Sequence, residues 1–341
     1  ADGQGDNVRD GVAILDVGKP TGRLERMLHA TRRVLARARS LDADIYHLHD
    51  PELLPVALVL KRAGKRVIFD AHEDLPRQIL SKPYLHPFLR RGVSDAAGFV
   101  EQFVAGRLDA VVAATPAIAE KFAAKGVRTV TVNNFPMLGE LETGIGGSEK
   151  HREVCYVGGI TAIRGIVELV RALELSVSGA RLNLGGQFSE SGTRAAVERL
   201  PGWAKVNELG FLSRSQMRDV LARSVAGIVT FLPAPNHTAA QPNKMFEYMS
   251  AGLPVIASDF PLWREIVEGN ECGICVDPCD PQAIAEAIDR LAGDPELAAR
   301  MGENGRCAVH ERYNWRIEER KLLDLYAALA WKTLGPVPTT A

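Results

Sequence analysis

Long apolar runs and an excess of charge of either sign are both missing from this chain of 341 residues. No run approaches the roughly 20 apolar residues that a membrane-spanning helix needs, so the sequence predicts no span. Lys and Arg total 41 against 42 Asp and Glu, and this balance implies no polyanionic partner such as nucleic acid. The 46% hydrophobic and 24% charged residues are typical of a soluble globular protein, long enough for two domains.

Cysteine is also scarce, with five residues in the whole chain. Cys272-x-x-Cys275 together with Cys307-x-x-His310 has a spacing that zinc ligands use. The run from Gly273 to Val276 indicates a strand, however, and alternate side chains of a strand face opposite sides. We therefore expect no metal site and free, reduced thiols in a cytoplasmic protein.

The most informative stretch runs from Asn236 to Ser258 and indicates a loop, a short helix, a turn and a buried strand. Asn243 is predicted to cap the helix, with Pro242 stopping it from extending backwards. Gly252 suits the left-handed position after the last helical turn, and Pro254 cannot continue the helix.

This helix start has the chemistry of a nucleotide-sugar site. Lys244 lies in the first turn, and a helix N-terminus with a cation is suited to binding phosphate. Glu247, one turn further on, can accept hydrogen bonds from the two neighbouring hydroxyls of a ribose. Gln241 and Asn243 are expected to complete the donor-binding surface at this helix end.

The run from Pro242 to Ser258 resembles the donor-site signature of glycosyltransferase family 4, which are retaining enzymes of the GT-B fold. That family carries two glutamates spaced E-x7-E, and the second falls on Glu247. The first falls on Ala239, which has no carboxylate. In the family the first glutamate contacts the transferred sugar and the second the ribose. The resemblance therefore implies nucleotide binding more directly than it implies catalysis.

A second phosphate-binding feature follows the predicted strand from Glu153 to Val157. Gly158-Gly159 opens a loop whose backbone N–H groups can approach an anion with no Cβ in the way. This loop resembles the corresponding loop of the family, which has an Arg after the first glycine and a Lys five residues later. Here Gly159 replaces that Arg and Arg164 stands in the Lys position, so Lys244 is expected to supply the second cation. Arg164 and Lys244 are the residues predicted to stabilise the departing diphosphate.

The resemblance also assigns residues beside the nucleotide base. Phe211 and Leu212 end the segment that begins at Val206 and that lies beside the base in the family. Gly185, in the strand before it, is a further predicted donor-binding residue. His237, in the loop before the helix, either reaches the sugar or makes a local hydrogen bond. No metal or cofactor is implied, and Asp42-Ala43-Asp44 is interpreted as solvent-facing and not as a metal motif.

In the first half of the chain, two successive strands end in histidine and acidic residues. Ligands of open parallel sheets bind at that edge. The family histidine beside donor sugar and acceptor falls on His72, the predicted catalytic residue of this half, with Glu73 and Asp74 on the acceptor side. His47 and His49 lie on one face of a strand and are assigned to the core or its rim.

Strands and helices alternate throughout, which predicts an α/β protein. The resemblance makes it GT-B-like, with two Rossmann-like domains whose parallel sheets face each other across a cleft. We expect an acceptor-side domain over residues 1–140, a donor-binding domain over 141–316 and a last helix over 317–341 that packs back toward the first domain. The Gly-rich segment 139–149 marks the boundary and a hinge. The first recognisable strand, residues 12–17, comes early, so the first domain is expected to lack its opening β-α-β piece.

Together these features predict metal-independent transfer of a sugar from a nucleotide-diphosphate donor to a glycan or lipid-linked acceptor in surface polysaccharide biosynthesis. Retention of configuration is implied by the resemblance alone. The alternatives are a nucleotide-sugar epimerase of the same fold and a non-catalytic binding protein, which Ala239 favours. We expect a cytoplasmic protein. The arginine-rich helix predicted from Leu24 to Leu41, like the segment from Lys82 to Arg91, is either a solvated surface or a peripheral contact with anionic lipid on the inner face of the plasma membrane.

Overall fold

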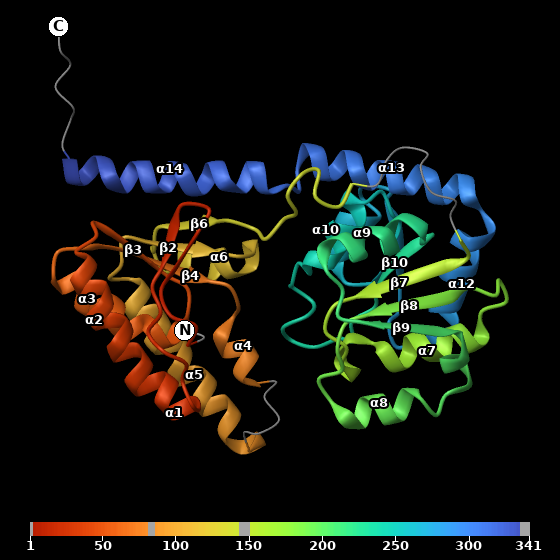
Figure 1. Cartoon of the computed structure of the whole chain (residues 1–341), viewed down its shortest axis with the longest axis horizontal. Helices are drawn as coiled ribbons and strands as arrows, with labels where there is room; N and C mark the ends of the chain where they lie inside the picture. Colours follow the sequence, from red (N-terminus) through yellow and green to blue (C-terminus); the bar gives the residue numbers. More distant parts are fainter. Residues whose placement is uncertain (1–2, 81–85, 143–150, 335–341) are drawn as a thin grey trace, which may run out of the picture. The chain divides into compact units, whose positions relative to one another are not determined.

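The computed structural model describes residues 3–80, 86–142 and 151–334 (Figure 1). It forms two compact units, one of Ala1–Asn133 with Glu319–Ala341 and the other of Asn134–Glu318. The second unit therefore includes residues 134–140, which the sequence assigned to the first domain, and residues 317–318, which it assigned to the last helix. Lys82, Pro83, Tyr84 and most of the predicted hinge lie outside the described residues.

The first unit is built on a four-stranded parallel sheet in the order β3-β4-β5-β6. Its core joins strand residues such as Phe69 to helix residues such as Leu60 and Phe122, all at most 2% exposed. The strands are β3 (Ile45–Leu48), β4 (Arg66–Ala71), β5 (Ala110–Ala113) and β6 (Thr129–Thr131), with helices α3 (Leu54–Arg62), α4 (Leu75–Leu80), α5 (Pro87–Ala105) and α6 (Pro116–Ala123), and a 3-10 turn, η2 (Pro51–Leu53).

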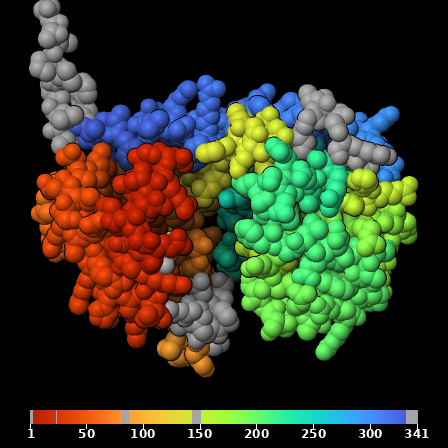
Figure 2. Space-filling view, in the orientation of Figure 1, coloured from red at the N-terminus to blue at the C-terminus, as the bar shows by residue number. Residues whose placement is uncertain are grey.

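The strand expected at residues 12–17 does not join this sheet. The shorter strand β2 (Val12–Ile14) pairs antiparallel with β1 (Asn7–Arg9), and Val12 is 65% exposed. Asp10 and Gly11 between them both have positive φ, the backbone of a tight hairpin turn. Figure 2 shows this N-terminal segment, in red, on the surface of the first unit. The hairpin turn chemistry explains why the sequence expectation was wrong.

The predicted arginine-rich helix is present in three pieces. It comprises α1 (Arg23–Glu25), a π-helical turn η1 (Arg26–Ala30) and α2 (Thr31–Leu41). Arg33 forms an ion pair with Glu25, and Arg37 with Asp6, so these arginines already have acidic partners within the unit. No helix among the described residues combines the length and apolar composition of a membrane span.

The second unit contains a six-stranded parallel sheet in the order β9-β8-β7-β10-β11-β12. Counted from β7, this is the 3-2-1-4-5-6 order of a doubly wound nucleotide-binding sheet. The strands are β7 (Glu153–Val157), β8 (Arg181–Gly185), β9 (Val206–Gly210), β10 (Ala226–Val229), β11 (Val255–Ser258) and β12 (Gly273–Val276).

Helices cover both faces of this sheet, because neighbouring residues of each strand enter different cores. Cys155 of β7 packs in one core, while Val154 and Tyr156 pack in the other. One core takes helices α9 (Arg214–Arg223), α10 (Asn243–Ser250) and α11 (Pro261–Val267), and the other takes α7 (Ile166–Leu175), α8 (Ser191–Val197), α12 (Pro281–Gly293) and the 3-10 turn η4 (Pro201–Lys205). Helix α13 (Pro295–Glu311) contributes its last turns to the first core and its first turns to the second. The two-domain α/β class with parallel sheets is thus confirmed.

Helix α10 begins one residue earlier than its predicted cap implies. Asn243 is its first helical residue, and Pro242 occupies the cap position without a side-chain hydrogen bond. The prediction of Asn243 as N-cap was therefore wrong, and the first N–H groups of this helix have no side-chain cap. Gly252 takes the predicted left-handed conformation, with φ of 71°.

The last helix, α14 (Trp315–Leu334), begins in the second unit, and from Glu319 on it belongs to the first. Leu325 and Leu329 of this helix are buried, and the Tyr326 hydroxyl lies 2.7 Å from Nδ1 of His47.

Candidate functional site

The sheet of the second unit places two loops at its switch point. Strands β7 and β10 are neighbours whose following segments leave toward opposite faces of the sheet, and ligands of such sheets bind outside the carboxyl ends at that point. Gly158-Gly159 follows β7, and the loop from Thr230 to Pro242 follows β10 and leads into α10. The topology therefore brings together the two segments that the sequence singled out separately.

The two predicted cations converge on the glycine loop. Arg164 lies in the 3-10 turn η3 (Ala162–Arg164), and its guanidinium donates a 3.1 Å hydrogen bond to the carbonyl of Gly159. Nζ of Lys244 lies 3.6 Å from the ring centroid of Tyr156 and 5.3 Å from that of Phe231. The Arg164 guanidinium lies 5.5 Å from the same Phe231 ring. Two positive charges thus approach one loop from two elements.

Lys244 is an unusual lysine, because it is 8% exposed and its ammonium has no hydrogen-bond partner. No described carboxylate lies within ion-pair distance of it. Burial, and then the nearby charge of Arg164, lower the pKa of Lys244 well below its ordinary value, with Glu247 opposing the shift. An unpaired buried ammonium costs several kcal/mol, so this arrangement is suited to a group that receives an anion.

Further polar atoms in the same loops are buried without a partner. They are the hydroxyl oxygens of Thr161 and Thr230, and the side-chain oxygen of Gln241. Thr161 is the residue before η3, and Thr230 and Gln241 lie in the loop between β10 and α10. Buried polar groups in folded proteins are normally hydrogen-bonded, so this concentration points to a ligand.

A side chain at either glycine of the loop would press against one of the two cations. A Cβ on Gly158 would lie 3.1 Å from Nζ of Lys244, and the residue has φ of 133°. A Cβ on Gly159 would lie 2.8 Å from a guanidinium nitrogen of Arg164. A substitution at either glycine would therefore displace the end of the Lys244 or Arg164 side chain from its position beside the loop.

Three of the predicted donor-binding residues, Gly185, Phe211 and Leu212, occupy one neighbourhood. The side chain of Leu212 packs so closely over Gly185 that an added Cβ there would lie 2.5 Å from it. Phe211, beside it, is 79% exposed, so its ring is free to stack on a ligand.

His237 makes the local bond that was one of its two predicted alternatives. Its Nδ1 lies 2.9 Å from the carbonyl of Leu232, and its ring lies 5.0 Å from Phe231. Burial lowers the pKa of His237, and the charge of Arg164 adds to this shift.

Glu247 has a partner that the sequence did not suggest. Its carboxylate accepts a 2.6 Å hydrogen bond from Arg214, which also bonds Glu140 at 2.8 Å. Glu247 and Asn243 line a pocket of about 360 Å³ together with Glu140, Arg214, Phe135, Trp315 and other residues of the 134–137 segment. A diol that binds Glu247 would have to share it with Arg214.

The first unit holds a histidine cluster around one carboxylate. Asp70, at the end of β4, lies 3.4 Å from Nε2 of His47, 3.3 Å from Nδ1 of His49 and 3.5 Å from Nδ1 of His72. Burial opposes its ionisation, but the histidines outweigh burial and lower the pKa of Asp70 to about 2. The sequence prediction named His72 and missed Asp70. Its place at a strand end, two residues before His72, was the available signal.

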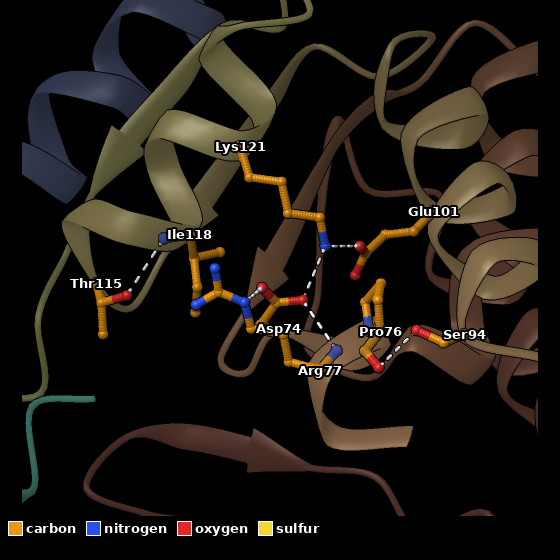
Figure 3. Close-up of polar contacts among 8 residues, drawn as sticks. All are labelled: Asp74, Pro76, Arg77, Ser94, Glu101, Thr115, Ile118 and Lys121. Atoms are coloured by element: carbon orange, nitrogen blue, oxygen red, sulfur yellow. Dashed lines mark hydrogen bonds and ion pairs between the residues drawn. The ribbon is translucent and has the colours of Figure 1, made fainter. Parts of the chain in front are cut away.

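The two acidic residues after His72 differ in their surroundings. Glu73 lines a cavity of about 250 Å³ with His49, Asp70 and His72, and hydrogen-bonds Gln78. Asp74 instead pairs with Lys121 at 3.3 Å and with Arg77 at 3.4 Å, and Lys121 also bonds Glu101 (Figure 3). Asp74 thus joins the start of α4 to α6.

Two family models match this chain, and together they span most of it. The model described as "Glycosyl transferases group 1" matches residues 142–307, and "Glycosyl transferase 4-like domain" matches residues 1–136. The chain belongs to these glycosyltransferases, which are of the GT-B type.

Curated relatives carry the same class of name. A capsular polysaccharide biosynthesis glycosyltransferase of Staphylococcus aureus is 27% identical over 179 residues, covering 50% of this chain and 44% of that protein. A glycosyltransferase of Methanocaldococcus jannaschii is 26% identical over 197 residues, covering 56% and 48%. A phosphatidyl-myo-inositol mannosyltransferase of Mycobacterium leprae is 23% identical over 300 residues, covering 85% and 74%. The chain thus spans about half the length of the first two.

Solved structures share the fold. A sucrose-phosphate synthase from Thermosynechococcus elongatus has a TM-score of 0.74 at 20% identity, covering 90% of this chain and 80% of that one. Anabaena HepE in complex with UDP has a TM-score of 0.70 at 19% identity, covering 91% and 84%. At these identities the likeness concerns the fold.

Proposed function

We propose that this chain transfers a sugar from a nucleotide-diphosphate donor to a glycan or lipid-linked acceptor in polysaccharide biosynthesis. The observation that carries the proposal is the buried, unpaired ammonium of Lys244 beside Arg164 and the Gly158-Gly159 loop. Breaking the bond between sugar and diphosphate leaves negative charge on the phosphate, and fixed cations with backbone N–H groups stabilise it. These groups supply that stabilisation without a metal ion.

Relatives support the substrate classes. One is named for capsular polysaccharide biosynthesis, and another for mannosyl transfer to phosphatidyl-myo-inositol, which is a lipid acceptor. HepE has been solved with UDP-glucose. UDP is therefore the first probe for this chain. Retention of configuration at the sugar carbon follows from the resemblance to family 4 and is part of the proposal.

Turnover is the direct test of the reaction. The chain is incubated with labelled nucleotide sugars and lipid-linked or oligosaccharide acceptors, and the product is separated from the free donor. We expect label in a glycosidic product with release of nucleoside diphosphate. Release of nucleotide with no glycosidic product would contradict transfer and favour the epimerase alternative.

Removing the Glu247 carboxylate tests its contact with the ribose. We expect Glu247→Gln to weaken UDP binding by about 10- to 100-fold, the range for a lost hydrogen bond to a charged group. The same change frees Arg214 from one partner. The readout is calorimetric affinity for UDP, with inorganic pyrophosphate as the second ligand.

Pyrophosphate has no ribose, so its affinity should change little in Glu247→Gln. Arg214→Gln is the matched variant, because it removes the guanidinium that pairs with Glu247 and keeps the Glu247 carboxylate. It should not weaken UDP binding. Equal UDP affinity in Glu247→Gln and wild type would remove Glu247 from the site.

The lowered pKa of Lys244 predicts proton uptake on donor binding. Lys244 faces Arg164, Tyr156, Glu247 and Cys155, and bound UDP, with its phosphates fully ionised, adds three negative charges that raise the pKa of Lys244. Above the pKa of Lys244 in the free protein, binding must therefore take up a proton, and affinity falls as pH rises, by at most about tenfold per pH unit. Proton uptake is measured by calorimetry of UDP binding in buffers of different ionisation enthalpy. The pH is kept above about 7.5, where the phosphates are fully ionised. Zero uptake over a pH range that extends to 10.5, the ordinary lysine pKa, would contradict the assignment.

A further inference from the structure

Three side chains of the first unit bring their ligand atoms together away from the donor site. His47, His49 and Asp70 each offer one ligand atom, a ring nitrogen or a carboxylate oxygen, and these three atoms lie within 4.8 Å of one another. His47 lies on strand β3, and His49 directly follows Leu48, the last residue of that strand. The two rings stack with their centroids 4.7 Å apart. Asp70 lies on the neighbouring strand β4, whose register pairs His47 with Ile68 and Leu48 with Phe69. The backbone thus fixes all three at one edge of the sheet.

We propose that His47, His49 and Asp70 bind a divalent transition-metal ion of the Zn²⁺ class. Their spacing fits coordination better than direct pairing. A charge-assisted hydrogen bond between imidazole and carboxylate is about 2.7–2.9 Å long, whereas Oδ2 of Asp70 lies 3.4 Å from His47 and 3.3 Å from His49. Two ligands that each lie about 2.0–2.1 Å from a tetrahedral zinc ion are about 3.3 Å apart.

The ring of His47 is already held from its other side. Its Nδ1 lies 2.7 Å from the hydroxyl of Tyr326 on α14. Metal-binding histidines normally make such a bond with the nitrogen that does not bind the ion, and the bond fixes tautomer and ring orientation. Nε2 of His47, the nitrogen aimed at Asp70, is buried and makes no hydrogen bond of normal geometry. A bound ion would satisfy it.

The site also has an entry path and an open position. The side chain of His49 is 58% exposed, and His49, Asp70 and His72 line the 250 Å³ cavity. A water molecule in that cavity would provide the fourth ligand, and the hydrogen bond of 3.0 Å between Nδ1 of His49 and Nε2 of His72 would give way to the ion. Two nitrogen ligands and one carboxylate favour Zn²⁺ and its neighbours over Mg²⁺ and Ca²⁺, which take oxygen ligands. The inference stands whether or not the chain transfers a sugar.

The test is metal titration of the full chain, with Zn²⁺ followed by calorimetry and Co²⁺ by its visible absorption. At a pH above the ordinary histidine pKa of about 6.5, we expect one Zn²⁺ per chain. His49→Ala, at an exposed side chain, should weaken Zn²⁺ binding by at least about 100-fold. Tyr326→Phe removes only the outer hydrogen bond and should weaken it by about tenfold. His29→Ala, at an exposed histidine elsewhere in the first unit, is the control and should change nothing.

Three outcomes would overturn the proposal. One is the absence of Zn²⁺ binding by the wild-type chain. Another is a Zn²⁺ affinity that is the same in wild type, in His49→Ala and in the second variant, Asp70→Asn. The third is a thiolate-to-cobalt charge-transfer band, which would place the ion on exposed cysteines such as Cys279 and Cys307.

Discussion

Lys244→Met is expected to abolish donor binding while it stabilises the folded chain. The ammonium is buried without a partner, and its pKa is lowered mainly by burial, so folding costs free energy at this position. An apolar side chain of similar length removes that cost, and we expect a gain of about 1–3 kcal/mol. The melting temperature should rise by about 2–4 °C per kcal/mol. UDP affinity should fall by at least about 100-fold, because a buried ion pair with the diphosphate is lost.

The pH dependence of the stabilisation follows from the sign of the shift. A lysine whose pKa is lowered by folding destabilises the fold most at low pH, where both states carry the proton. The cost disappears as pH rises toward 10.5, the ordinary value. The gain in Lys244→Met, measured by chemical denaturation at several pH values, should shrink in the same direction.

Lys205→Met is the matched control in the same unit. The Lys205 ammonium donates hydrogen bonds to the carbonyls of Leu173 at 2.6 Å and Ser176 at 3.1 Å, so its removal should lower stability and leave UDP affinity unchanged. A Lys244→Met variant that binds UDP like wild type, or that is destabilised like Lys205→Met, would contradict the anion-site assignment.

Ala239→Glu is expected to raise the rate of sugar transfer by about 100-fold, the scale of one electrostatic contact made in the transition state. Ala239 is half-exposed in the loop between β10 and α10, so a longer side chain has space there. In family 4 the glutamate at this position contacts the transferred sugar. The introduced carboxylate should contact the transferred sugar and leave the affinity for the diphosphate unchanged. Steady-state kinetics with the donor that wild type accepts give kcat and KM separately.

UDP affinity is the control for this variant, since UDP has no sugar for the introduced carboxylate to contact and its affinity should stay within about twofold of wild type. Ala239→Gln, similar in size and uncharged, separates charge from bulk and should gain little. Tight UDP binding with no turnover in Ala239→Glu would support a non-catalytic binding protein.

The donor half of the fold was predictable because its signals are local. Alternating strands and helices fix the βαβ order, and Gly252 and Pro254 mark where α10 stops. The approach of Arg164 and Lys244 to the same loop was also anticipated, although the two residues are far apart in sequence. It follows from a resemblance that states which loops meet. The burial of Lys244 without a partner was not visible in the sequence, since exposure depends on packing from both faces of the sheet.

What the sequence missed depends on contacts between distant elements. Arg214 pairs with both Glu247 and Glu140, although the three residues are far apart in the chain. Asp70 was taken as the end of a strand, while the structure makes it the centre of three histidines. The hairpin of β1 and β2 depended on two turn residues of positive φ, Asp10 and Gly11, a signal present in the sequence and not used.

The central claim is that the second unit binds a diphosphate through the Gly158-Gly159 loop, Arg164 and Lys244. The most direct measurement is a crystal structure of the chain soaked with UDP. We predict phosphate oxygens at hydrogen-bond distance, about 2.7–3.2 Å, from Nζ of Lys244 and from the Arg164 guanidinium. UDP phosphates bound elsewhere, with Lys244 still unpaired, would contradict the account.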